Sequence, residues 1–331
     1  MPHAAPPAQR PLRLGRTGLA FDPADRGITP ARFADATLRG VAQVIFVNNA
    51  YTGLLCLVGI ALASPAQMGA ALLCTALGTA TGLLLKADRD DLQGGLYGYN
   101  GCLIALAVPL FLGHGALTWA LALVATALSS VLMRALLARK PFGLPALTAP
   151  FVLCTWAAVW AVRAIAPADP GTGIYRAVPV DPPGLLDGWP VVEGTITAIG
   201  QVYLQSGLLS GTVIALAVLA GSRPMFLAAL LAGVASATVA TLLALPEEAI
   251  RTGLFGFNAV LAALALGLVT LRPTLGSLTL ALALASLMPL IQMGCSHVLI
   301  RLGLPTMSVP FIATTWLALT LLRAIPGPRP T

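Results

Sequence analysis

Charged residues are scarce in this sequence. Asp, Glu, Lys and Arg make up 9% of its 331 residues, whereas 57% are hydrophobic and the mean hydropathy is +0.88. Soluble domains carry about 25% charged residues, and a soluble chain of this size could not bury so much apolar surface. The shortage of charge therefore excludes an ordinary soluble domain and indicates a protein whose apolar faces lie in lipid.

The sequence also lacks the features of several other classes. Residues 1–40 have no apolar core long enough for a cleavable signal peptide, so we expect the first membrane segment to direct insertion. No His/Glu metal spacing and no nucleophile–base pair stands out, which argues against an enzyme and predicts no cofactor. The five cysteines are expected to be small buried hydrophobic residues rather than disulfides or metal ligands: Cys56, Cys74, Cys102, Cys154 and Cys295.

Long apolar runs fill most of the remaining chain. A transmembrane helix needs about 20 mostly apolar residues. The runs are continuous and rich in Leu and Ala, which favours helices over the alternating strands of a β-barrel. The sequence predicts ten spans, at 41–63, 66–86, 96–112, 116–138, 144–165, 194–220, 224–245, 253–271, 274–300 and 304–325.

The distribution of basic residues predicts an orientation. The net charge is +7, and the first 40 residues contain six arginines: Arg10, Arg13, Arg16, Arg26, Arg32 and Arg39. This bias is typical of a cytoplasmic tail under the positive-inside rule, not of nucleic-acid binding. Arg323 and Arg329 place the C-terminus on the same side.

The chain contains an internal repeat. The run Gly95-Leu-Tyr-Gly-Tyr-Asn100 recurs as Gly253-Leu-Phe-Gly-Phe-Asn258, and Gln43 recurs as Gln201, both at an offset of 158 residues. At an offset of 160, Gly143-Leu-Pro-Ala-Leu-Thr-Ala-Pro-Phe151 recurs as Gly303-Leu-Pro-Thr-Met-Ser-Val-Pro-Phe311. Three motifs in one order indicate two homologous halves.

The two repeats and the segments that flank them divide the chain into five parts. We expect a cytoplasmic tail at 1–30, a first repeat at 31–165, a linker at 166–193, a second repeat at 194–325 and a C-terminal tail at 326–331. The linker is rich in Pro, Gly and acidic residues, which suits the extracytoplasmic side. With the N-terminus inside, each half then crosses an odd number of times. Five crossings per half would make an inverted repeat, a common plan in transporters and channels.

The repeated Gly/Pro motifs predict irregular backbone at membrane depth. Such backbone survives only inside protein or along a cavity. Leu-Pro at 144–145 and 304–305 suits the start of a helix, while Pro150 and Pro310 would break a helical ladder. The Gly95 and Gly253 motifs suit tight entries into short helices. Packing alone could explain any single motif, but recurrence favours a pore.

Two polar pairs occupy matching positions in apolar surroundings: the amides Gln43 and Gln201, and the hydroxyls Thr148 and Ser308. Buried groups of this kind need partners, which another helix or a solute can supply. No charged residue lies within the pore motifs, whereas ion-coupled carriers usually keep ionisable groups in the membrane. His297 near the end of its span is expected to pack rather than to transfer protons. The pattern favours a neutral polar solute.

These motifs resemble the urea transporter family over about residues 30–325. The family's signature, Leu-Pro-x-x-Thr-x-Pro-Phe, occurs once per half: complete from Leu144 to Phe151, and from Leu304 to Phe311 with Ser308 in place of Thr. The run Gln43-Val-Ile-Phe-Val-Asn-Asn49 and the two Gly-aromatic-Asn motifs are also similar to the family's.

The resemblance implies a homotrimer in the bacterial inner membrane, with one passive urea pore per subunit between inverted repeats that each hold five crossing helices and a tilted half-helix. Gln43 and Gln201 would bind urea at the two ends of the filter, and Thr148 and Ser308 would face its middle. The resemblance further assigns Phe46 and Leu204 to the slot mouths, Tyr99 and Phe257 to aromatic walls, and Leu103 and Leu261 to aliphatic walls.

Two alternatives remain open at this point. The same fold could conduct another small neutral solute, such as a short amide or ammonia. An ion-coupled secondary transporter is a second, less favoured hypothesis.

Overall fold

The computed structural model of the chain describes residues 29–165 and 189–324. Every regular element in these ranges is helical. The tails predicted at 1–30 and 326–331 and the linker predicted at 166–193 lie almost wholly outside the described residues.

The first half contains seven α-helices. They are α1 (Pro30–Gln43), α2 (Ala50–Ala63), α3 (Pro65–Leu84), α4 (Arg89–Gln93), α5 (Tyr99–Leu112), α6 (Ala116–Arg139) and α7 (Ala149–Ile165), with a 3₁₀ turn η1 (Pro141–Gly143) before α7.

The second half repeats this order. Its helices are α8 (Pro190–Gln201), α9 (Leu208–Gly221), α10 (Arg223–Leu242), α11 (Glu247–Arg251), α12 (Phe257–Leu264), α13 (Leu275–Arg301) and α14 (Val309–Ala324). A π-helical segment η2 (Ala265–Thr270) continues α12. Two helix starts match closely: Ser64 caps α3 and Ser222 caps α10, each through its hydroxyl and with Pro in the first turn.

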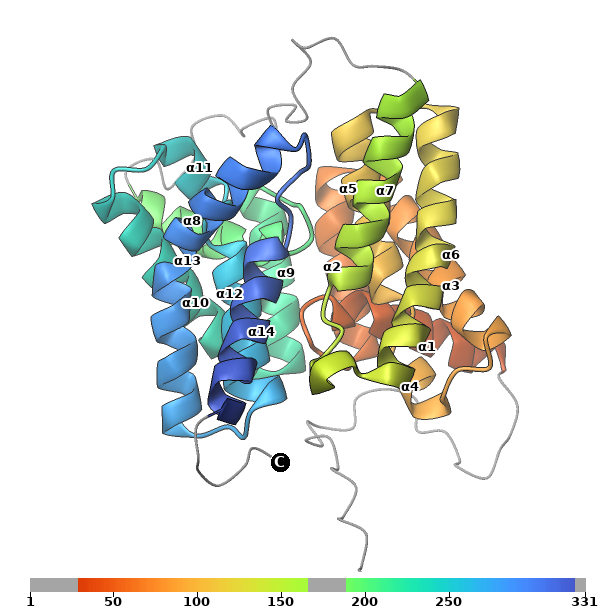
Figure 1. Cartoon of the computed structure of the whole chain (residues 1–331), viewed down its shortest axis with the longest axis horizontal. Helices are drawn as coiled ribbons and strands as arrows, with labels where there is room; N and C mark the ends of the chain where they lie inside the picture. The colour runs from red at the N-terminus through yellow and green to blue at the C-terminus, as the bar shows by residue number, and fades with distance from the viewer. Residues whose placement is uncertain (1–28, 166–188, 325–331) are drawn as a thin grey trace, which may run out of the picture.

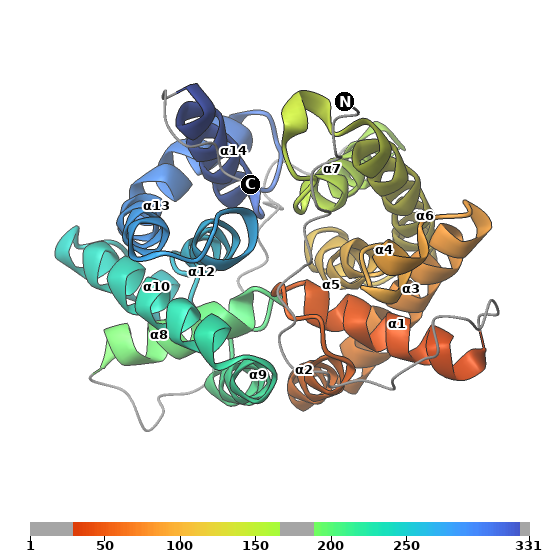
Figure 2. The same ribbon diagram turned by 90° about the horizontal axis from the view of Figure 1, so that it is seen from below.

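The two halves lie side by side (Figure 1, Figure 2). Helix α2 packs against α9 across the junction, where the Thr52 hydroxyl donates to the carbonyl of Ala217 at 3.3 Å. In Figure 1, α1 and α4 lie near the lower end of the molecule, while their counterparts α8 and α11 lie near the upper end. Large apolar side chains are exposed on the outer helices, as expected for surfaces that face lipid.

Four helices are long and apolar enough to cross a membrane: α3, α6, α10 and α13. Six shorter apolar helices accompany them: α2, α5, α7, α9, α12 with η2, and α14. The predicted run at 41–63 is therefore not one helix, because it is interrupted between α1 and α2; the run at 194–220 is interrupted between α8 and α9 in the same way. Apolar residues continue past the end of each first helix, up to Val47 and Leu204, and hid the break.

The prediction for Pro150 and Pro310 was also wrong. Helices α7 and α14 begin at Ala149 and Val309, so each proline lies in a first turn, where its missing N–H removes no helical hydrogen bond. The Leu-Pro pairs instead lie in irregular segments that precede these helices, followed by a turn at 147–148 and at 307–308. Pro150 and Pro310 therefore start helices rather than break them.

Candidate functional site

The two signature loops meet at the junction of the halves. Thr148 Oγ1 lies 2.7 Å from Ser308 Oγ, and both side chains are buried. Each residue directly precedes the first turn of its helix, α7 or α14. Because one hydroxyl must donate to the other, each keeps lone pairs for another donor. The pair is thus a small polar centre inside an apolar interior.

Reciprocal contacts hold the two loops in place. Trp156 Nε1 on α7 donates to the carbonyl of Pro305 at 2.9 Å, and Trp316 Nε1 on α14 donates to the carbonyl of Pro145 at 2.9 Å. Arg323 adds a forked contact, with Nη1 on the carbonyl of Phe142 and Nη2 on that of Gly143. Each half therefore supports the loop of the other, which positions Thr148 and Ser308 together.

The site concentrates left-handed backbone at residues that are not glycine. Leu147 and Met307, which precede Thr148 and Ser308, have φ of 47° and 45°. Phe46 and Leu204, in the interruptions after α1 and α8, have φ of 62° and 56°. Each such residue costs on the order of 1–3 kcal/mol and persists only where its surroundings enforce it, most often at functional sites. The pair Lys86 and Ala244 also has matching positive φ, so these four positions stand out by adjoining the signature hydroxyls and the helix interruptions as well as by their strain.

The interruptions end α1 and α8 inside the protein. The N–H of Val47 donates to the carbonyl of Ala42, and the N–H of Gln205 donates to the carbonyl of Gly200, which closes each helix end around its left-handed residue. The ring of Phe46 then packs edge-on against Phe311, with centroids 6.1 Å apart and planes at 72°. This contact ties the first interruption to the opposite half.

The two glutamines end these helices but differ in surroundings. Gln43 is half-buried, and its Nε2 donates to the carbonyl of Gly94 at 2.8 Å, which leaves Oε1 to accept from another donor. Gln201 lines an internal cavity. The charged groups near these helices are paired: Arg39 with Asp35 at 2.6 Å, and Arg251 with Glu193 at 2.5 Å. The hydrogen bonds that Arg251 donates to Glu247 and Glu193 raise the pKa of Arg251 above its usual value.

A cavity of about 490 Å³ leads to the hydroxyl pair. Of the ten residues that the resemblance assigned, seven line it: Leu103, Thr148, Gln201, Leu204, Phe257, Leu261 and Ser308. Gln43, Phe46 and Tyr99 do not. The cavity thus gathers residues from both halves of the chain and extends toward the second half.

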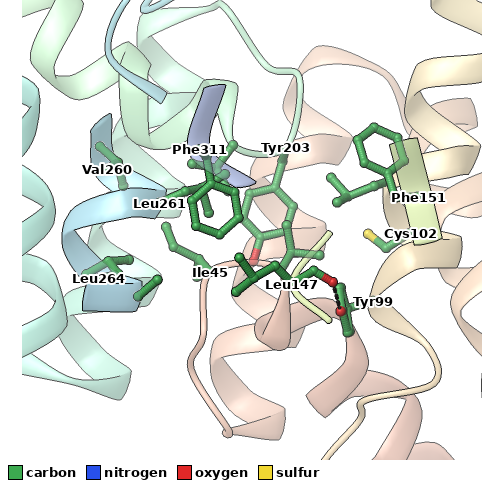
Figure 3. Packing of buried hydrophobic residues seen from close by; sticks show 14 of the residues in the cluster. Ile45, Tyr99, Cys102, Leu147, Phe151, Tyr203, Val260, Leu261, Leu264 and Phe311 are labelled. Atoms are coloured by element: carbon green, nitrogen blue, oxygen red, sulfur yellow. Dashed lines mark hydrogen bonds between the residues drawn. The ribbon is translucent and has the colours of Figure 1, made fainter. Parts of the chain in front are cut away.

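Tyr99 has a different place from Phe257, its counterpart. Its hydroxyl donates to the carbonyl of Leu147, the strained residue before Thr148 (Figure 3). Tyr203 is similarly buried, and its hydroxyl donates to the carbonyl of Val41 at 2.9 Å. Both phenols therefore satisfy buried backbone oxygens beside the site.

The sequence analysis missed one wall of the cavity. Helix α13 contributes Gln292, Met293, Ser296, His297 and Ile300, and the signature loop adds Thr306. His297, expected to pack, is exposed and lines the cavity. The polar run Gly294-Cys-Ser-His297 inside an apolar helix was the available signal.

The cavity wall carries almost no charge. His297 is the one titratable side chain among the described residues that line it, and no Asp, Glu, Lys or Arg belongs to them. Across the described parts of the chain, no three His, Cys, Asp or Glu side chains are grouped so as to hold a metal ion. Amides, hydroxyls, the His297 imidazole and apolar surfaces are therefore the groups available to a solute here.

Comparison with known proteins gives one family. The family model described as "Urea transporter" matches residues 34–323. Urea transporter 1 of Ovis aries is 30% identical over 302 residues, covering 88% of this chain and 77% of the relative. Urea transporter 1 of Capra hircus has the same identity and coverage, and that of Mus musculus is 29% identical over 300 residues with the same coverage.

Proposed function

This chain belongs to the urea transporter family, and we propose that it lets urea cross the membrane passively through a pore between its two halves. Membership makes it a transporter and not an enzyme, and its apolar helices make it a multi-pass membrane protein. The passive mechanism and the filter residues are the proposal.

The meeting of Thr148 and Ser308 at 2.7 Å carries this proposal. Urea is flat and neutral, with four N–H donors and one carbonyl acceptor, and uncompensated loss of its water would cost several kcal/mol. The two paired hydroxyls keep one O–H donor and oxygen lone pairs that can replace that water. A single buried polar pair binds weakly enough to release the solute, as conduction requires.

The remaining assigned residues complete a slot. Leu103 on α5 and Leu261 on α12 supply aliphatic surface to the cavity, and Phe257 supplies an aromatic face. Such walls suit the broad faces of a flat molecule and disfavour tetrahedral solutes. Gln43 and Gln201 then bind urea at the two ends, with Phe46 and Leu204 at the mouths and Tyr99 behind the wall.

The absence of charge supports passive transport of a neutral solute. An ion would lose hydration without compensation among the described cavity residues, which include no Asp, Glu, Lys or Arg. A proton- or ion-coupled carrier is expected to keep a chain of ionisable groups in its path, whereas His297 stands alone among the described cavity residues. The neutral wall therefore supports facilitated diffusion over coupled transport.

The placement of the halves supports the inverted repeat. Helices α1 and α4 lie at the opposite end of the molecule from α8 and α11 (Figure 1), and the two tryptophan contacts are reciprocal. We assign five crossings and one half-helix to each repeat, 31–165 and 194–325. Both termini are cytoplasmic and the 166–193 linker is extracytoplasmic in this proposal, as the arginine bias favours. The assembly is a homotrimer in the bacterial inner membrane.

Stopped-flow light scattering on proteoliposomes tests the function. Under an inward urea gradient, we expect fast urea equilibration that an imposed membrane potential does not change. Accumulation driven by the potential would overturn the passive mechanism. If correctly folded protein carried acetamide or ammonia but no urea, the neutral-solute channel would replace the urea channel.

A further inference from the structure

One wall of the cavity differs in chemistry between the two halves. Helix α13 presents Gln292 and Ser296, and the loop before α14 presents Thr306. Counted from the start of each helix or loop, the matching residues of the first half are Met133, Leu137 and Ala146, all apolar. Both contact the first turn of the neighbouring helix: Met133 lies beside the Tyr99 hydroxyl on α5, and Gln292 lies beside Asn258, one position further along, on α12.

Hydrogen bonds fix which way the Asn258 amide points. The backbone N–H of Phe311 donates to Asn258 Oδ1 at 3.3 Å, so the Asn258 nitrogen must face the other way. That nitrogen donates to the carbonyl of Met307 at 3.1 Å and to Gln292 Oε1 at 2.6 Å. The chain of donors and acceptors leaves a single orientation for both amides.

This orientation turns the Gln292 nitrogen into an available donor. Its oxygen is engaged by Asn258, and its Nε2 has no acceptor among the described residues. The side chain is only 5% exposed, yet it belongs to the cavity wall. Its Nε2 is not among the buried side-chain atoms that lack a partner, so this nitrogen opens on the cavity, where a solute can accept from it.

An acceptor of N–H groups lies one helical turn away. Ser296 follows Gln292 by four residues and so shares its face of α13. The Ser296 hydroxyl lies 2.9 Å from that of Thr306, and one must donate to the other. Whichever one donates, Ser296 Oγ keeps at least one lone pair, and Ser296 lines the same cavity.

The first half provides no equivalent. There Asn100 accepts from the N–H of Phe151, but its Nδ2 is buried without a partner, and Met133 offers no amide. The Tyr99 hydroxyl already donates its hydrogen bond to the carbonyl of Leu147. A donor beside an acceptor in the cavity wall is thus a feature of the second half within the described residues.

We propose that Gln292 and the Ser296–Thr306 hydroxyl pair form a urea-binding site in the wall of the cavity, ahead of the Thr148–Ser308 junction. The Gln292 N–H donates to the urea carbonyl, and the Ser296 oxygen, held by Thr306, accepts from a urea N–H. This inference rests on the proposed urea transport. A passive pore gains no driving force from such a site; the site lowers the urea concentration at which flux saturates.

The test measures urea flux against urea concentration in proteoliposomes. Gln292→Met introduces the residue of the matching first-half position, and Ser296→Ala removes one hydroxyl. Ser286→Ala is the control, because Ser286 is on the same helix but bonds only to its own helix at the carbonyl of Leu282. We expect Gln292→Met to raise the half-saturating urea concentration about three- to tenfold, as the loss of one or two hydrogen bonds predicts. Ser296→Ala should raise it less, and Ser286→Ala should not change it.

Unchanged half-saturation in both Gln292→Met and Ser296→Ala would overturn the site, as would a fall in maximal flux alone, which would mean that Gln292 only orients Asn258. If Gln292→Met does not fold, Ser296→Ala decides by the same criterion. Wild-type protein without urea flux would instead refute the proposed function.

Anomalous diffraction from crystals with selenourea gives a readout independent of flux. A peak within hydrogen-bond distance of Gln292 Nε2 supports the site. Its absence, while peaks occupy the junction, argues against it.

Discussion

Thr148 Oγ1 and Ser308 Oγ lie 2.7 Å apart, although 160 residues separate them in the chain. Their contact places the two signature motifs at one point, where each half supplies one hydroxyl. The loops that carry them are supported across the junction by Trp156 and Trp316. The solute path that we propose is therefore a product of both halves.

The first prediction concerns this hydroxyl pair. Thr148→Val keeps the shape of the side chain but removes the hydroxyl and leaves Ser308 buried without its partner, which costs about 1–3 kcal/mol. We expect urea flux in proteoliposomes to fall about tenfold. Thr320→Val is the matched control, since the Thr320 hydroxyl bonds only to its own helix at Trp316. Wild-type flux in correctly inserted Thr148→Val would remove the pair from the solute path.

The second prediction concerns the two glutamines. Gln43→Ala and Gln201→Ala each remove an amide at one end of the proposed filter, and we expect each to lower urea permeability about three- to tenfold. Stopped-flow light scattering measures the effect. Gln93→Ala, at an exposed glutamine on α4, should leave permeability unchanged. Wild-type urea permeability in both Gln43→Ala and Gln201→Ala would contradict the assignment of the filter ends.

The third prediction concerns the hydrogen bonds that Trp156 and Trp316 donate to the signature loops of the opposite halves. Trp156→Phe keeps an aromatic ring but loses the hydrogen bond to the carbonyl of Pro305, worth about 1 kcal/mol. The melting temperature of detergent-solubilised protein should fall by about 2–4 °C. Trp160→Phe serves as control, because Trp160 lies on the same helix and is 56% exposed. A melting temperature lowered equally by both variants would show that the hydrogen bond is not the cause.

The fourth prediction concerns close packing of α1 on α2. A Cβ added at Gly53 would lie 1.9 Å from the carbonyl oxygen of Leu38, so the helices would have to separate. Gly53→Ala should therefore abolish a monodisperse peak in size-exclusion chromatography of detergent-extracted protein. Gly69→Ala on α3, where nothing lies within 4 Å of the added methyl, should behave as wild type. A normal elution profile for Gly53→Ala would refute this packing argument.

The helical class and most helix positions could be predicted, because apolar composition and the requirement to satisfy every backbone group in lipid leave few options. The interruptions at 44–49 and 202–207 could not. Their first residues, up to Val47 and Leu204, are as apolar as the helices beside them, and Phe46 and Leu204 adopt left-handed backbone without the glycine that usually signals it. Tertiary contact, such as that of Phe46 with Phe311, enforces the conformation.

Candidate residues were predictable where the repeat marked them. Recurrence singled out Thr148 with Ser308 and Gln43 with Gln201, but it carries no information about a wall present in one half alone. Gln292 and Ser296 have apolar counterparts, Met133 and Leu137, so comparison of the halves passed over them. Their place in the cavity wall depends on how α13 packs against α12 and on the Asn258 amide that fixes Gln292.

The sequence by itself determined that this chain is an apolar, helical membrane protein of two homologous halves with neutral polar groups at matched positions. These properties follow from composition and periodic recurrence, which need no knowledge of contacts. Only the tertiary structure decided that Thr148 contacts Ser308, that Pro150 and Pro310 begin helices, and that one wall of the cavity is polar. Such facts depend on distances between residues far apart in the chain, and those distances are set by packing across the junction of the halves.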